Sequence, residues 1–170
     1  MDRLSLLLLL ALLLALPHAP AAIKVADLHP SANQRTCVQI PLCQASLIGN
    51  LPRLRDVLQE ADTLVDERDA TQWTALHRAA RAGQVGAVEL LLGAGAALEL
   101  RTDWGFSALH LASSYGQDGV VVALLRAGAD AAARTDGEGI RGGKTALLLA
   151  KDGSAVAAAF AAHQAPKGDL

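Results

Sequence analysis

The chain has 170 residues, of which 52% are hydrophobic and 19% charged, so it can build the core of one domain. Its formal net charge of -2 gives no basic excess for binding DNA or RNA, and we set nucleic acid aside as a partner. Aromatic residues make up only 3%, which predicts a core of small and aliphatic side chains on closely spaced helices.

The first segment predicts export. Residues 4–16 form an apolar run behind Arg3 that only a serine interrupts. As a helix this run would span about 20 Å, which is shorter than a hydrocarbon core of roughly 30 Å. Pro17 and Pro20 then break the helix among small residues that suit cleavage, so we interpret residues 1–21 as a secretory signal peptide. An uncleaved membrane anchor is the alternative.

A cleaved leader would place the mature chain in a bacterial periplasm, in the medium or in a eukaryotic secretory lumen, without a stable membrane span. Residues 22–39 have no periodicity and predict an irregular lead-in. Cys37 and Cys43 are the only cysteines, and in an exported chain such a pair favours a disulfide. The alternative is that Cys43 is simply a small buried side chain. We expect no metal site, because His29 is the only further ligand nearby.

A repeat organises the rest of the chain. Residues 74–80, with the sequence TALHRAA, return 33 residues later as SALHLAS at residues 107–113. Each copy is followed by a glycine, an apolar run ending in Leu-Leu, and Gly-Ala. A fixed period of this length indicates one supersecondary unit stacked on itself.

These residues resemble the ankyrin repeat: the TALH and SALH starts, the glycine closing each first helix, and the LLGAGA and LLRAGADA tails. The resemblance implies an all-α ankyrin-repeat solenoid of three to four helix-turn-helix repeats. We place the repeat domain at residues 40–163 and a tail at 164–170. The expected repeats are 40–68, 69–101, 102–134 and 135–163.

The two end repeats depart from the pattern. The first has Ile40 at the position of the capping hydroxyl and Cys43 at the position of the histidine. In the last, residues 145–150 restart the first helix after an insertion, Leu148 replaces the histidine, and an Ala-rich stretch at 155–162 forms the second helix. Terminal units of stacked arrays are usually atypical, because one of their faces meets water.

Two features could indicate chemistry, a pair of histidines and a Gly-rich insertion, and each can also have a structural role. In the ankyrin pattern the histidine ties adjacent repeats, which we expect of His77 and His110; neither has a Ser or Cys nearby at nucleophile spacing. Residues 137–145 contain GxGxxG and end in Gly-Lys-Thr, but Glu138 stands where a P-loop needs glycine. We expect an elongated finger there, and nucleotide binding is the minor alternative. No residues satisfy the demands of an enzyme site, and we predict no catalysis and no cofactor.

Aromatic residues gather in the turns before the first helices of the second and third repeats, and each of these turns contains a Trp. We expect the second of these turns to be one residue shorter than the first. In the ankyrin family these turns form fingers along a concave surface that binds proteins, and exposed aromatics with arginine are common interface anchors. The alternative is that a finger Trp folds back and covers the adjacent repeat. The contact positions implied by the resemblance, with a basic edge from two arginines, are Ala70, Thr71, Trp73, Arg78, Arg81, Ala82, Asp103, Trp104, Phe106, Ser114 and Tyr115.

We therefore predict a monomeric, non-catalytic protein-protein interaction module that binds an exported protein partner through its fingers and concave helical face. The alternative is an accessory factor that stabilises an exported or membrane-associated enzyme.

Overall fold

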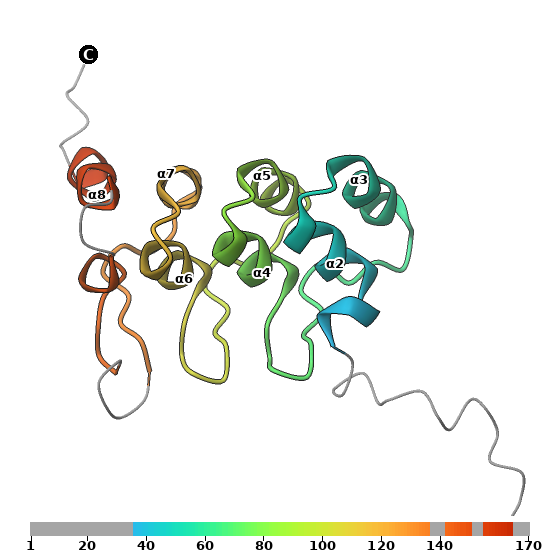
Figure 1. Ribbon diagram of the computed structural model, residues 1–170, viewed down its shortest axis with the longest axis horizontal. Helices are drawn as coiled ribbons and strands as arrows, with labels where there is room; N and C mark the ends of the chain where they lie inside the picture. Colours follow the sequence, from blue (N-terminus) through green and yellow to red (C-terminus); the bar gives the residue numbers. More distant parts are fainter. Residues whose placement is uncertain (1–35, 137–141, 151–154, 165–170) are drawn as a thin grey trace, which may run out of the picture. The chain divides into compact units, whose positions relative to one another are not determined.

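The computed structural model describes residues 36–136, 142–150 and 155–164 (Figure 1). The predicted signal peptide, residues 22–35 of the lead-in, the centre of the insertion and most of the tail lie outside this part of the chain. The described residues form seven α-helices, two short 3-10 helices and an isolated bridge between Arg134 and Thr145. In chain order the helices are η3 (Cys37–Gln39), α2 (Pro41–Ile48), α3 (Leu51–Gln59), α4 (Ala75–Ala82), α5 (Val85–Gly93), α6 (Ala108–Ser114), α7 (Asp118–Arg126), η4 (Leu147–Leu149) and α8 (Val156–Gln164).

The helices lie in two rows. Helices α2, α4 and α6 are neighbours in the first row, and α3, α5, α7 and α8 follow one another in the second (Figure 1). Within each repeat the two helices pack together, as α4 does on α5 and α6 on α7. The predicted all-α repeat solenoid is confirmed. The connecting loops extend beside the first row, and we call them finger 1 (residues 62–74), finger 2 (95–107) and finger 3 (128–136 with 142–145).

Small side chains set the spacing between the rows. Ala79, Ala80 and Ala112 are fully buried in the core, where Leu91 and Leu124 of the second row fill the remaining space. Interiors pack at the density of organic crystals, so alanine at these positions allows neighbouring helices to approach closely. This agrees with the core of small and aliphatic side chains on closely spaced helices that the composition predicts.

The last repeat differs from expectation. Residues 145–150 were expected to restart a full first helix, but the described part contains only the short 3-10 helix η4. Leu148, which stands in place of the histidine, is exposed and has no ring nitrogen to accept a hydrogen bond from the backbone of Thr145. The second helix, α8, begins at Val156 and buries Val156 and Phe160.

Each internal histidine ties its own helix to the next finger. The Thr74 backbone N–H donates to Nδ1 of His77 at 3.1 Å, and Nε2 of His77 lies 3.0 Å from the Leu100 carbonyl oxygen. A backbone N–H only donates, so Nδ1 is the acceptor and Nε2 carries the proton. His110 repeats this arrangement, with its Nε2 3.0 Å from the Ala133 oxygen. The tying role that the resemblance implied for both histidines is confirmed.

A ladder of arginines makes a second set of ties between fingers. Arg68 Nη1 donates to the Arg101 carbonyl oxygen, 33 residues on, at 3.0 Å. Arg101 donates in the same way to the carbonyl oxygen of Arg134, and Arg134 Nη1 donates to that of Gly143 at 2.7 Å. Arg68 and Arg101 thus each tie their finger to the next one, and Arg134 makes its bond within finger 3. Their spacing of 33 residues is visible in the sequence, although the motifs that define the repeat do not include them.

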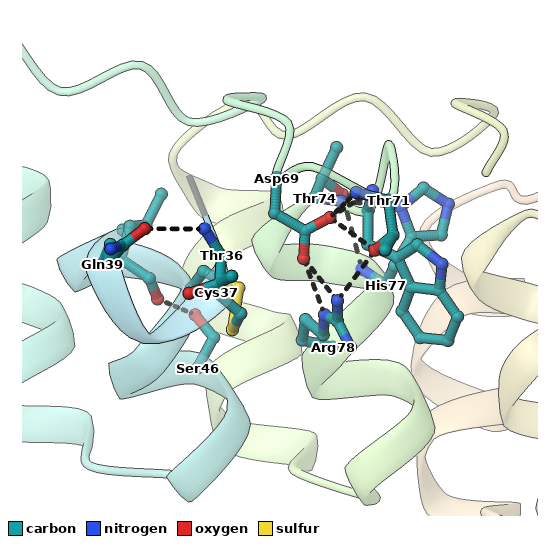
Figure 2. Close-up of a disulfide and its surroundings, with 12 residues drawn as sticks. Thr36, Cys37, Gln39, Ser46, Asp69, Thr71, Thr74, His77 and Arg78 are labelled. Carbon is teal, nitrogen blue, oxygen red and sulfur yellow. Dashed lines mark hydrogen bonds and ion pairs between the residues drawn. A yellow bond between two sulfur atoms is a disulfide. The ribbon is translucent and has the colours of Figure 1, made fainter. Parts of the chain in front are cut away.

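The first repeat has a disulfide where the others have a histidine. The sulfurs of Cys37 and Cys43 are 2.12 Å apart and both residues are buried (Figure 2). Cys43 therefore bonds backwards to η3, whereas His77 and His110 bond forwards to the next finger. This geometry agrees with the pairing that the sequence favours.

Two buried serines at matching positions differ in one respect. Ser46 Oγ donates to the Leu42 oxygen at 2.7 Å, whereas Ser113 Oγ has no partner in the part of the chain that the structure describes. The residue at this position in the repeat between them is Ala80. An unsatisfied buried hydroxyl costs about 1 kcal/mol or more, so Ser113→Ala should raise the free energy of unfolding by about that amount. Urea denaturation of Ser113→Ala and Ser46→Ala tests this; equal effects of the two substitutions would contradict it.

Burial lowers the pKa of His77 from its ordinary 6.5 to about 4, and burial also lowers the pKa of His110. Between pH 6.5 and about 4, His77 binds a proton in the unfolded chain but not in the folded one. Its contribution to the free energy of unfolding is therefore fully present above pH 6.5 and is lost as the pH falls. We expect His77 alone to remove on the order of 3 kcal/mol by pH 4. Denaturation curves across this range measure the slope. His77→Asn should flatten it and the exposed His163→Asn should not; a flat wild-type curve would refute the assignment.

Candidate protein-binding surface

The side chains of two fingers and two first helices meet in one cluster. We call it the aromatic-arginine cluster, and it consists of Trp73, Arg78, Arg81, Trp104 and Tyr115. The Arg78 guanidinium carbon lies 4.4 Å from the centroid of the Trp73 ring, and that of Arg81 lies 5.7 Å from it. Arg81 also lies 4.9 Å from the Tyr115 ring, and Trp104 meets Trp73 edge to face at 6.3 Å. The cluster therefore joins residues that the sequence predicted as separate contact positions.

Two of the predicted contact residues are structural. Trp73 and Phe106 were expected as exposed anchors, with folding back over the adjacent repeat as the alternative for a finger Trp. Each is only 5% exposed, so exposure is wrong for both and the alternative holds for Trp73. They pack together with Leu111 in a small apolar cluster, and their rings lie 6.3 and 6.4 Å from those of His77 and His110 respectively. Each ring thus covers the tie at the base of its finger. Because burial of these large rings stabilises the folded finger, they are not available for contact with a partner.

The two turns have equal length, which corrects the expected difference of one residue. Asp69 N–H donates to the Trp73 oxygen at 2.9 Å, and Thr102 N–H donates to the Phe106 oxygen at 3.0 Å. Asp69 therefore corresponds to Thr102, and Trp73 corresponds to Phe106. Trp104 takes the position of Thr71, so the two Trp residues are not equivalent and only Trp104 lies at a finger tip.

Gly105 allows finger 2 to lie against finger 3. Its φ is +70°, and an added Cβ would come within 2.5 Å of the Asp136 backbone nitrogen. The corresponding residue of finger 1 is Gln72, whose φ of 59° is also in the left-handed region. The turn thus requires this conformation in both fingers, and in finger 2 it also requires the absence of a side chain.

The buried carboxylate of Asp69 fixes finger 1 and Arg78. Its Oδ1 accepts from the backbone N–H groups of Thr71 and Trp73, and its Oδ2 pairs with the Arg78 guanidinium (Figure 2). Burial alone would raise the pKa of Asp69, but the hydrogen bonds from Thr71 and Arg78 outweigh it and hold that pKa below its ordinary value. Arg78 therefore has a structural role, because the Asp69 carboxylate compensates its charge within the chain.

The exposed part of the cluster consists of Arg81, Trp104 and Tyr115. Trp104 is 63% exposed and Tyr115 is 48% exposed, which is unusual for large aromatic side chains. Of the other predicted positions, Ala70, Thr71 and Asp103 are exposed, while Ala82 and Ser114 are half-buried.

The first repeat contributes two residues that the predicted contact positions did not include. Leu47 and Ile48 occupy the positions of Arg81 and Ala82 in the repeat register, and both are exposed. Aligning α2 with α4 along the chain would have found them. They place two exposed apolar side chains at the C-terminal end of α2.

The residues considered for catalysis and nucleotide binding have hydrogen-bond partners within the chain. Both nitrogens of His77 and of His110 already have hydrogen-bond partners. The Gly143 N–H donates to the Thr135 oxygen and the Lys144 N–H to Thr135 Oγ1, so these groups are not free to bind phosphate as in a P-loop. In the described ranges no three His, Cys, Asp or Glu side chains are grouped as a metal site would need. Nor does that part of the chain contain a helix long and apolar enough to span a membrane.

Comparison with known proteins agrees with this architecture. The family model for ankyrin repeats, in three copies, matches residues 42–135, which include α2 except for its first residue, α3 to α7 and all of fingers 1 and 2. No curated protein matches the chain significantly. Ankyrin repeats generally act as protein-protein interaction modules and are typically non-catalytic. The matched region is more than half of the chain, and the chain belongs to the ankyrin repeat family.

Proposed function

We propose that the chain is a non-catalytic binding module that recognises a protein partner through the exposed part of the aromatic-arginine cluster. The observation that carries this proposal is the exposure of Trp104 and Tyr115 around Arg81. Trp, Tyr and Arg are the residue types that dominate binding energy in protein interfaces. The rigid base beneath them lowers the entropy cost of binding, because Trp73 and the histidine ties already hold the fingers in place.

We also propose that the module acts as a monomer after export. Two features support export: the apolar run at residues 4–16, and the position of Cys37 and Cys43 at bonding distance. Disulfides persist in oxidising compartments, which matches the compartment that a signal peptide would lead to. Two readouts test this: the intact mass of tagged chain recovered outside the cytosol, and its thiol content. A chain that retains residues 1–21, or that reacts with thiol reagents when folded, would contradict the proposal.

Affinity capture with matched variants tests the binding surface. We expect the full chain, immobilised by a tag and exposed to the native exported fraction, to retain a protein that Trp104→Ala and Tyr115→Ala retain far less. Removing a central interface aromatic costs about 2 kcal/mol, so each affinity should fall roughly thirtyfold. Both side chains are exposed, so these substitutions should leave the fold intact.

Arg126→Ala is the matched control for this capture. Arg126 is exposed and is the last residue of α7, which lies in the second row (Figure 1), and it does not belong to the aromatic-arginine cluster. Isothermal titration with the purified partner should give the same affinity for this variant as for the wild type. A partner lost by Arg126→Ala but retained by Trp104→Ala would place the interface on the second row instead.

A further inference from the structure

Arg81 is held between two aromatic rings at the end of α4. Its guanidinium carbon lies 5.7 Å from the Trp73 centroid and 4.9 Å from the Tyr115 centroid. A guanidinium over aromatic faces is attracted by their negative charge density, so the two rings orient it. Its side chain is exposed and forms no ion pair with any residue that the structure describes.

Arg78, one turn earlier on the same helix, is an arginine whose charge is compensated within the chain. Its Nη2 pairs with the buried Asp69 carboxylate and also donates to Thr71 Oγ1 at 3.0 Å. The fold has therefore supplied a carboxylate for Arg78 but none within the described residues for Arg81. Arg81 is an oriented cation with donor groups available to a ligand.

Apolar surface surrounds this cation. Trp104 stands edge to face on Trp73 at 87°, and it is mostly exposed, as is nearly half of Tyr115. A ligand that pairs with Arg81 would therefore also cover aromatic surface. Charge and apolar area together favour a peptide that carries both an acidic and an apolar side chain.

We propose that the aromatic-arginine cluster binds an acidic peptide segment of the protein partner. An Asp or Glu carboxylate of that segment pairs with Arg81, and a neighbouring apolar side chain covers Trp104 or Tyr115. The planar N–H fork of arginine matches a carboxylate in two parallel hydrogen bonds, and its stacking lowers the entropy lost on pairing. The inference rests on the proposed function and adds the chemistry of the partner.

Selection of peptides tests this proposal. The probe is a library of randomised dodecapeptides displayed on phage and selected on the full chain. We expect the retained peptides to be enriched in Asp or Glu beside an apolar residue. Arg81→Met should weaken a selected peptide at least tenfold, as should replacing the peptide's Glu by Gln. Arg126→Met is the matched control and should bind like the wild type.

A variant of opposite sign sharpens the test. Asp103 is exposed on the same turn as Trp104 and carries the same charge as the proposed ligand. Asp103→Asn should therefore strengthen binding of the acidic peptide, and more so at low salt. Circular dichroism and melting curves verify that all variants are folded.

The possible outcomes separate the two proposals. If selected peptides lack acidic residues, or bind Arg81→Met as tightly as wild type while Trp104→Ala abolishes binding, the acidic-segment inference is overturned and the proposed function stands. If Trp104→Ala and Tyr115→Ala have no effect on any selected peptide, the proposed function fails as well.

Discussion

The hydrogen bond from a buried imidazole to the next finger is the contact on which the rest of this structure depends. His77 reaches the Leu100 carbonyl and His110 reaches the Ala133 carbonyl, each across 23 residues of chain. Both histidines are buried, so these bonds are stronger than exposed ones and an unpaired ring nitrogen would be costly. The neutral tautomer is required, because only a bare Nδ1 accepts from the helix cap. This one interaction therefore contributes to the fold, to the pH dependence of stability and to the position of the fingers.

Further sets of contacts repeat at the period of the chain and reinforce this one. Asp66 accepts from the Ala97 N–H at 3.1 Å, and Glu99 accepts from the Asp130 N–H at 2.9 Å. These carboxylates tie finger bases together beside the arginine ladder. Each tie is a local contact between neighbours, so the stability of the array is distributed along it, as expected of stacked repeats. The first repeat, which lacks the histidine, has the Cys37–Cys43 bond in its place.

The sequence predicted the repeats well, because helix caps and apolar faces are local patterns. It located the starts of α4 and α6 and the roles of His77 and His110. It failed where the outcome depends on competition between contacts. Trp73 and Phe106 are residue types that often anchor interfaces. The base of each finger contains an apolar site for them, however, and burial of their rings there is favourable.

Register was the other source of error. The turns before α4 and α6 were expected to differ in length by one residue, whereas the backbone hydrogen bonds align Asp69 with Thr102 and make the two turns equal. In helix η4, Leu148 is exposed and cannot form the tie that histidine makes in α4 and α6. The exposed cluster of Arg81, Trp104 and Tyr115 could be listed residue by residue from the sequence. Only the geometry shows that Arg81 and Tyr115 lie against each other, and that Arg78 is already paired.

Site-specific photocrosslinking tests the central claim, that the fingers present a protein-binding surface, most directly. A benzophenone amino acid would replace Trp104 in one variant and Arg126 in another, and each folded chain would be irradiated in the native exported fraction. We expect a single partner adduct from position 104 and none from position 126. An adduct that forms only from position 126 would contradict it.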